Sequence, residues 1–341
     1  MSELLETVVN PSPTDGRNID PALGALQGEG ALQRVARLDP ARPYERLPAR
    51  ADSTASEDSY YGMPLLKEPV WKWPVAAYLY TGGLAGASAA LAAAGLLRKD
   101  LRGLVRTGRF IALGGAATSA AFLIQDLGIR GRFVYMLRVF RPTSPMNLGT
   151  WILGAFSTAA GAAAVFDSDL AGVAAGVLGL PLCGYTAVLI SNTAVPLWQE
   201  ARAHLPPLFC ASAAASAASA FELLALTPAE DRTVRKLAVL GKSAELLSDL
   251  LLERHVSRVE RVGRPLKTSL SGALWKAAKL CTLASLALSL LPRKSRRVRF
   301  AGGLLGTAGA VATRFALFHG GKASARDPHA VFDQQRAGQG H

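Results

Sequence analysis

Cysteine is scarce in this sequence, which limits the redox chemistry that the chain can carry by itself. Only three cysteines occur in 341 residues, and each stands alone in an apolar run, without C-x-x-C spacing: Cys183, Cys210 and Cys281. Protein-bound iron–sulfur clusters require several cysteine thiolates. We therefore expect no iron–sulfur cluster in this chain, and the cysteines indicate neither a disulfide framework nor a redox compartment.

Charged residues are also sparse, at 18% of the chain, whereas 50% of the residues are hydrophobic. The formal net charge is nevertheless +13. The basic residues stand in short breaks between apolar runs, and no basic stripe with interleaved aromatic residues is found, so we expect no nucleic-acid partner. Anionic lipid and the topology of membrane loops explain the basic excess more simply.

The sequence is rich in apolar runs that are long enough to cross a bilayer. After Lys72, the stretch that ends at Leu97 holds 25 residues without a charge. About 20 apolar helical residues, each rising about 1.5 Å, cover a hydrocarbon core of about 30 Å. Small residues in this stretch allow close helix packing in lipid. Its start is marked by four aromatic side chains of the kind that favour the membrane interface: Trp71, Trp73, Tyr78 and Tyr80.

Seven more apolar runs follow, separated by short charged breaks: 110–125, 142–166, 170–197, 205–226, 237–252, 270–291 and 300–318. No strand-like alternation competes with the helical pattern, and backbone groups in lipid must be satisfied within helices or closed barrels. We therefore predict an all-α integral membrane protein, with eight transmembrane helices forming one membrane domain in residues 71–320.

The two ends of the chain are polar. Residues 1–70 lack the apolar core of a secretory signal, and we expect a largely unstructured extension in which residues 21–38 order only against a partner. A simple unstructured extension is the alternative. Residues 321–341 are predicted to form a C-terminal tail.

The basic clusters suggest an orientation in the membrane. Eight spans would leave both termini on the same side. The densest basic clusters, residues 98–109 and 293–299, lie in short loops on the opposite side. The positive-inside rule then predicts that these loops are cytoplasmic and that both termini face outward, although the basic residues of 254–267 favour the reverse.

Four segments of the sequence carry distinctive motifs. The first joins YYGMP, W-x-W and YLYTGGLAGA in residues 60–87, and the second is FRPTSPMNLGTWIL at 140–153. The third is GYTAVLISNTAVPLW at 184–198, and the fourth is the ending at 314–328 with its S-A-x-D-P element. Taken in order, these segments resemble the NrfD/polysulfide reductase family of membrane subunits. The resemblance covers residues 60–328 and leaves the preceding 59 residues outside it.

The resemblance implies two four-helix bundles in a bacterial cytoplasmic (inner) membrane. It implies a subunit without redox metal that exchanges electrons between the quinone pool, menaquinone or ubiquinone, and a docked iron–sulfur (ferredoxin-like) subunit. That partner would belong to a respiratory oxidoreductase complex with a molybdopterin or multihaem catalytic subunit. Whether protons are also translocated is left open, and no catalytic residue is assigned to this chain.

For the quinone head group, the resemblance points first to Tyr185, which matches the tyrosine understood to hydrogen-bond the quinone. Tyr78, Trp73 and His204 complete the predicted quinone-binding set. Polysulfide reductase types carry an Asn and a His in the first span, and these positions hold Val75 and Tyr78 here. An interfacial anchor is the alternative role for Tyr78.

Ionisable residues inside spans are costly, at about 2.5 to 3.5 kcal/mol for a central Asp, Lys or Arg, so they require a reason. Lys242, Glu245 and Asp249 are spaced by three and four residues and should share one helix face. With Glu222 and Asp126 they form a predicted chain of proton carriers. The alternative is a Lys242–Glu245 ion pair that only holds the helices together.

The alternatives to this interpretation are a bound haem, a secondary transporter and a purely structural anchor. Haem requires facing axial ligands, and His204, His255 and His319 all fall at the ends of predicted spans, so we expect none. A secondary transporter would use discontinuous helices, for which the break at 179–181 is a candidate. A purely structural membrane anchor is the other alternative.

Overall fold

The computed structural model describes residues 19–20, 25–26, 66–127, 131, 133–292 and 295–338. The chain divides into two units, residues 1–62 and 63–341. In the first unit, strands β1 (Ile19–Asp20) and β2 (Ala25–Leu26) pair antiparallel. The predictions for the rest of the N-terminal extension, including most of residues 21–38, lie outside the described residues.

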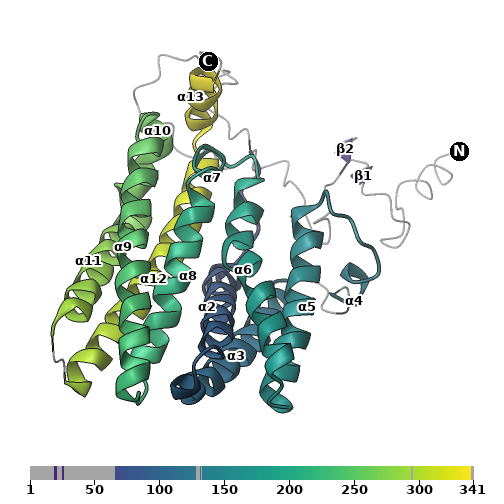
Figure 1. The fold of residues 1–341 in the computed structure, drawn as a ribbon. Helices are drawn as coiled ribbons and strands as arrows, with labels where there is room; N and C mark the ends of the chain where they lie inside the picture. The colour runs from purple at the N-terminus through teal and green to yellow at the C-terminus, as the bar shows by residue number, and fades with distance from the viewer. Residues whose placement is uncertain are drawn as a thin grey trace, which may run out of the picture. The chain divides into compact units, whose positions relative to one another are not determined.

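The second unit is helical throughout its described elements (Figure 1). Long helices occupy all eight predicted runs: α2 (Trp73–Gly95), α3 (Arg102–Asp126), α5 (Pro145–Val165), α6 (Asp169–Ser191), α8 (Leu205–Glu222), α9 (Pro228–Val256), α11 (Ser269–Leu290) and α12 (Arg296–Ala325). Shorter helices lie between and after them: η2 (Lys99–Leu101), α4 (Phe133–Met136), α7 (Pro196–Glu200), α10 (Glu260–Gly263), η4 (Arg264–Leu266) and α13 (Pro328–Gly338). The expected all-helical fold is confirmed.

Six of these helices are long and apolar enough to cross a membrane: α2, α3 with η2, α5, α6, α11 and α12. The chain is therefore a multi-pass membrane protein. Helices α8 and α9 fall outside this set, because the prolines and serines of α8 lower its mean hydropathy and α9 carries many charges. Both pack against other helices, and so need not be apolar all round. The eight spans and the two bundles stay predictions.

Several boundaries differ from those that the apolar runs predicted. Helix α3 begins eight residues before its apolar run, and α9 extends beyond its run at both ends. The fourth predicted span, residues 170–197, was wrong beyond Ser191. Helix α6 ends at Ser191, and Pro196 begins the separate short helix α7. Helix α12 continues to Ala325, and α13 follows within the predicted C-terminal tail.

Helix α9 shows how the sequence fixes such an end. The Thr227 hydroxyl accepts from the Glu230 backbone N–H, and the Glu230 carboxylate accepts from the Thr227 N–H, which makes a capping box with Pro228 at the first helical position. Acidic residues stand in its first turn and Arg254 with His255 in its last. These charges complement the helix dipole, so α9 can begin in a charged break.

Helix α2 lies at the centre of the packing, in contact with α3, α6, α8 and α12. It crosses α6 where Gly86 meets Gly179: a Cβ on Gly86 would lie 2.4 Å from the Gly179 carbonyl oxygen, so neither residue can carry a side chain. Helix α6 continues through Pro181. The idea of a discontinuous helix at 179–181 is therefore wrong; the glycine serves close packing.

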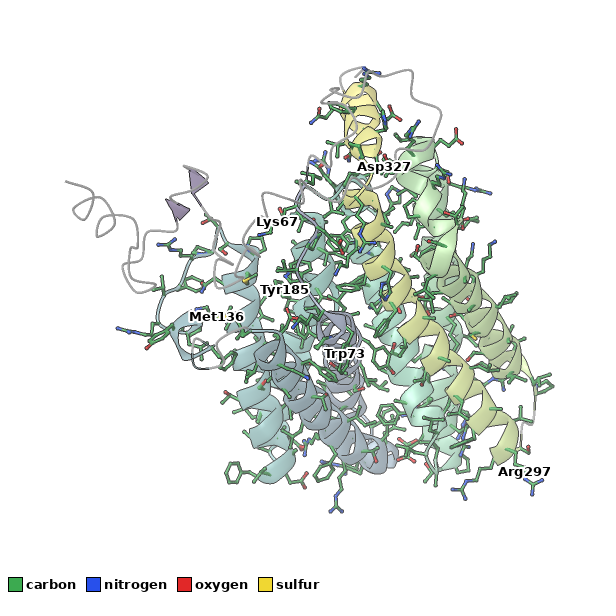
Figure 2. All side chains as sticks on the ribbon, turned by 180° about the vertical axis from the view of Figure 1, so that it is seen from behind. Lys67, Trp73, Met136, Tyr185, Arg297 and Asp327 are labelled. Carbon is green, nitrogen blue, oxygen red and sulfur yellow. The ribbon has the colours of Figure 1, made fainter. Side chains whose placement is uncertain are left out.

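Two ends of the helical unit matter for function. We call the end that holds Trp71, Trp198 and Ser324 the tryptophan end, and the end that holds Arg98, Glu222 and Arg297 the arginine end. Because successive long helices are antiparallel, α2 begins and α6, α9 and α12 finish at the tryptophan end. Figure 2 shows Arg297 and Asp327 at opposite ends of the unit.

Candidate functional site

Tyr185 is held at a site built by the start of α5. Its hydroxyl donates to the Pro145 carbonyl at 2.7 Å, and its side chain is almost fully buried. A Cβ on Gly149 would lie 1.8 Å from the Tyr185 ring, so any side chain at position 149 would overlap the ring and only glycine leaves room for it. Pro145 and Gly149 belong to one segment of the family resemblance and Tyr185, labelled in Figure 2, to another, and these contacts show that the fold brings the two segments together.

The chain before α5 is fixed by Asn147. Its side-chain amide donates to the carbonyls of Met136 and Val139, and its oxygen accepts from the Arg141 backbone N–H at 2.6 Å. The Trp151 ring packs edge-on against Phe140. The second segment of the resemblance therefore holds its own loop in place, which in turn positions the carbonyl that Tyr185 uses.

Tyr78 lies in α2, fully buried and within electrostatic range of Tyr185. Its alternative role as an interfacial anchor is therefore wrong, because a residue at the lipid–water interface would be exposed. Trp73 does have that character: it is 53% exposed, and its ring packs edge-on against Phe122. Asp126 accepts a hydrogen bond from the Lys72 backbone N–H at 3.1 Å, so it joins the end of α3 to the start of α2.

His204 lies just before α8 and stacks on His255, with ring centroids 4.5 Å apart. His255 Nε2 lies 3.4 Å from a Glu200 carboxylate oxygen. Burial, with the nearby His255 and Arg258, lowers the pKa of His204. A surface hollow of about 360 Å³ adjoins this group, lined by Gln199, Glu200, Arg202, His255, Gln334 and Gln335. The structure thus brings His204 together with an acid and a second histidine.

His319 does not end a helix, because α12 runs six residues beyond it. Around the end of α12, the outer segments of the resemblance meet. The Trp71 ring stacks on Trp198 at 5.8 Å, and Trp198 Nε1 donates to the Leu317 carbonyl at 2.8 Å. The Leu197 N–H donates to the Ser324 hydroxyl at 3.3 Å. Segments from the beginning, middle and end of the chain therefore join at the tryptophan end.

Lys242 forms a buried ion pair with Glu222. Lys242 Nζ lies 2.7 Å from Glu222 Oε2 and 3.0 Å from the Ser289 hydroxyl, which itself donates to Glu222 Oε1 at 3.0 Å. The exposed fractions of the Lys242 and Glu222 side chains are 0% and 1%. The suggested Lys242–Glu245 ion pair is therefore wrong, because the lysine pairs with a carboxylate on α8.

Glu245 and Asp249 are buried on the same face of α9 as Lys242, as their spacing predicted, and each is 1% exposed. The Glu245 carboxylate faces the Ser212 hydroxyl of α8, and neither of its oxygens makes a hydrogen bond of good geometry within the described residues. Both carboxylates lie within electrostatic range of Arg314 of α12, which is also 1% exposed, and Asp249 lies within range of Lys279 as well. Sequence reasoning missed Arg314, although a lone cation within the 300–318 run was the signal that could have revealed it.

Arg314 connects the carboxylates to the tyrosine region. Its Nε donates to the Leu79 carbonyl, next to Tyr78, and one of its terminal nitrogens donates to the Phe209 carbonyl, both at 3.2 Å. Its guanidinium carbon lies 3.8 Å from the centre of the Phe209 ring, a cation–π contact. Arg314 thus contacts α2 and α8 from α12, beside the two carboxylates.

The buried ionisable groups follow one another along the molecule. Asp249 is nearest the tryptophan end, and Glu245, Lys242 and Glu222 follow toward the arginine end. Seven residues of helix rise about 10 Å, which is the axial distance from Asp249 to Lys242. Side chains capable of proton exchange therefore extend along α9 from Asp249 to Lys242, and from there to Glu222, the last residue of α8.

Metal-binding groups are not part of this arrangement. Within residues 66–127, 133–292 and 295–338, no three His, Cys, Asp or Glu side chains are grouped so as to hold a metal ion. Cys183, Cys210 and Cys281 are all free thiols. The polar groups around Tyr185 are its own hydroxyl and the Pro145 carbonyl, with the Tyr78 hydroxyl within electrostatic range, and these groups suit hydrogen bonding.

The comparison with known protein families agrees with the four segments. The family model described as polysulfide reductase, of the NrfD type, matches residues 58–326, and so includes all eight long helices. No curated protein matches the chain. The match covers well over half of the sequence and indicates a membrane subunit of a redox complex. The chain therefore belongs to the NrfD/polysulfide reductase family.

Proposed function

We propose that this protein is the quinone- or quinol-interacting subunit of a multi-subunit oxidoreductase. In this proposal Tyr185, with Tyr78, Trp73 and His204, forms the quinone site, and a docked iron–sulfur subunit exchanges electrons with it. A molybdopterin or multihaem catalytic subunit lies beyond that partner. The observation that carries the proposal is the construction around Tyr185, where Pro145 and Gly149 fix a buried phenol.

The residues present fit a quinol head group. Quinol, as the substrate, supplies two electrons and two protons when it is oxidised. The Tyr185 hydroxyl already donates to Pro145, so its oxygen lone pairs remain able to accept a hydrogen bond from a quinol hydroxyl. Tyr78 supplies a second buried phenol, while the half-exposed Trp73 ring offers an apolar surface for the tail.

We further propose that the buried ionisable groups carry protons away from this site. Glu245 and Asp249 accept protons, Arg314 stabilises their ionised forms, and the Lys242–Glu222 pair continues the route toward the arginine end. Asp126, bound to the start of α2, serves the tryptophan end instead. In the proposed orientation, eight spans in two four-helix bundles place the arginine end in the cytoplasm and both termini outside.

Replacing Tyr185 with phenylalanine tests the quinone site. The ring would still fill the space beside Gly149, so the complex should assemble, but quinol turnover should fall at least tenfold, because a buried hydrogen bond to the substrate is worth about 1.4 kcal/mol or more. Tyr135→Phe, at an exposed tyrosine, is the matched control. Unchanged turnover in Tyr185→Phe with normal assembly would instead identify a purely structural anchor.

Replacing Glu245 with glutamine tests the proton route separately. The assembled complex should keep its bound partners but lose most of its proton release during quinol oxidation, since glutamine cannot carry a proton. Glu260→Gln, at an exposed position of α10, should change nothing. If Glu245→Gln oxidises quinol and releases protons at the wild-type rate, the route does not pass through Glu245.

A further inference from the structure

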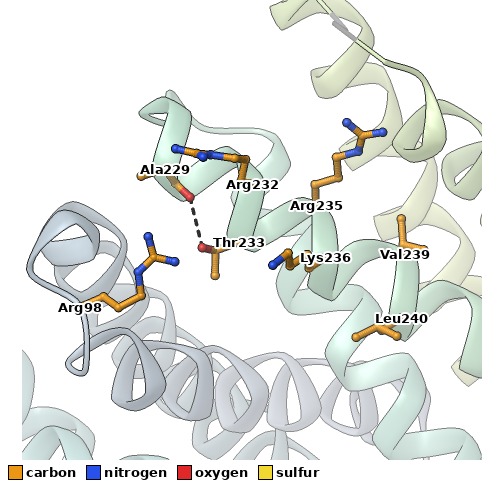
Figure 3. A pocket seen from close by; sticks show the side chains of 8 residues that line it. All are labelled: Arg98, Ala229, Arg232, Thr233, Arg235, Lys236, Val239 and Leu240. Carbon is orange, nitrogen blue, oxygen red and sulfur yellow. Dashed lines mark hydrogen bonds between the residues drawn. The ribbon is translucent and has the colours of Figure 1, made fainter.

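A second hollow, of about 610 Å³, opens at the arginine end, and none of the residues proposed for quinone lines it. Figure 3 shows the side chains that line this hollow. It lies between Arg98, which follows α2, and the first part of α9. Its wall carries four cationic side chains together with smaller and apolar ones: Arg98, Ala229, Arg232, Thr233, Arg235, Lys236, Val239 and Leu240. Nothing in the proposed electron or proton chemistry uses this group.

The arginines are positioned by bonds that leave most of their donors available. Arg232 Nε donates to the Pro228 carbonyl at 3.1 Å, and an Arg235 terminal nitrogen donates to the Leu290 carbonyl at 3.0 Å. A guanidinium has five N–H donors, so each keeps several for a ligand. Asp100 pairs with Arg98 at the rim, and with this acid counted the hollow still carries an excess of about three positive charges.

The order of side chains along α9 indicates what kind of anion fits. The cations occupy positions 232 to 236, and Val239 and Leu240 follow one turn further from the helix start. Leu240 is 70% exposed. An anion that binds here therefore contacts positive charge near the start of α9 and an apolar surface one turn further along the helix. A glycerophospholipid has the same order, with phosphate at the interface and acyl chains below it.

We propose that this hollow binds one anionic glycerophospholipid. Its phosphate group contacts the cations of α9 and Arg98, and an acyl chain lies along Val239 and Leu240. Inorganic phosphate carries the same kind of negative charge but has no acyl chain to contact the apolar surface. The proposed ligand is therefore the lipid. The proposal is independent of the quinone site, because it concerns the opposite end of the molecule.

The test uses the intact complex, purified in mild detergent, stripped of lipid and titrated with defined lipids under native mass spectrometry. Wild-type protein should bind dioleoylphosphatidylglycerol more tightly than dioleoylphosphatidylcholine, and inorganic phosphate should not displace it. At about fivefold per cation near the membrane surface, R232Q/R235Q/K236Q should bind the anionic lipid on the order of a hundredfold more weakly. The matched control is R106Q/R296Q/R297Q, which removes three exposed cations outside the hollow.

Two single variants keep the test decisive if the triple variant does not fold. Lys236→Gln should weaken phosphatidylglycerol about fivefold. Leu240→Ser should weaken the lipid while leaving any binding of inorganic phosphate unchanged. Equal binding of both lipids, equal binding by the triple variant and its control, or displacement of the lipid by inorganic phosphate would each overturn the proposal.

Discussion

Removing Lys242 alone should destabilise this protein far more than removing Lys242 and Glu222 together. The paired atoms are 2.7 Å apart and shielded from solvent. At an effective dielectric constant of about 20 their attraction is about 6 kcal/mol, and it is largely offset by the desolvation of the two ions. Replacing only one of the two residues removes this attraction, while the other residue still bears the cost of burying its charge. Lys242→Met and Glu222→Gln should therefore each lower the free energy of unfolding by about 3 to 5 kcal/mol.

The double variant should lie within about 1 kcal/mol of the wild type, since glutamine can still accept the hydrogen bond from Ser289 and neither position 242 nor position 222 then carries a buried charge. Unfolding by sodium dodecyl sulfate in mixed micelles, followed by circular dichroism, gives the four free energies of the cycle. The partly exposed pair Lys279–Glu253 is the control, and its coupling should be at most about 1 kcal/mol. Additive losses at Lys242 and Glu222 would refute the reasoning.

Two further predictions concern Tyr185 and His204. Gly149→Ala should displace the Tyr185 ring and cut quinol turnover as severely as Tyr185→Phe, because the new Cβ would lie 1.8 Å from the ring. Gly154→Ala is the control and should retain full turnover, because its new Cβ would have no atom closer than 3.9 Å. Equal effects of the two variants would contradict the described packing of Gly149 against Tyr185. Because the pKa of His204 is lowered from 6.5, the folded state disfavours its protonation. Its contribution to stability should be complete above pH 6.5 and lost as the pH falls through the folded pKa. Thermal unfolding between pH 5 and 8 should show this acid loss in the wild type and less of it in His204→Gln, and parallel profiles would rule it out.

The sequence predicted the helices well because burial in lipid leaves a simple signal. A run of apolar residues that must satisfy its own backbone hydrogen bonds can only be a helix or a barrel strand. The charged ends were predicted less well. Arg109, placed in a loop, is buried inside α3, because Asp167 and Asp169 reach it from the connection between α5 and α6. An arginine therefore continues a helix when a distant acid pairs with it, and spacing along the chain does not reveal that acid.

The same limit explains the error about Lys242. Glu245 is three residues away and on the same helix face, so local spacing favours it as the partner. Glu222 is 20 residues away in sequence, yet the packing of α8 on α9 brings it to 2.7 Å. The face of a helix can be predicted from periodicity, but the choice among partners depends on which helices pack together. Only the structure supplies that information.

Counting charges in the buried cluster leads to one more consequence for the proposed proton route. Lys242 is paired with Glu222, and Lys279, which also lies near Asp249, is paired with Glu253. Among these cations Arg314 is then the one that balances both Glu245 and Asp249. With both carboxylates ionised the cluster carries one net negative charge, and a net charge buried in a membrane protein is costly. One proton shared by Glu245 and Asp249 makes the cluster neutral, and that proton is the one that can be exchanged. Infrared spectra should then contain the band of one protonated carboxylic acid that shifts in Asp249→Asn and Glu245→Gln, and its absence from the wild type would mean that the cluster holds no such proton.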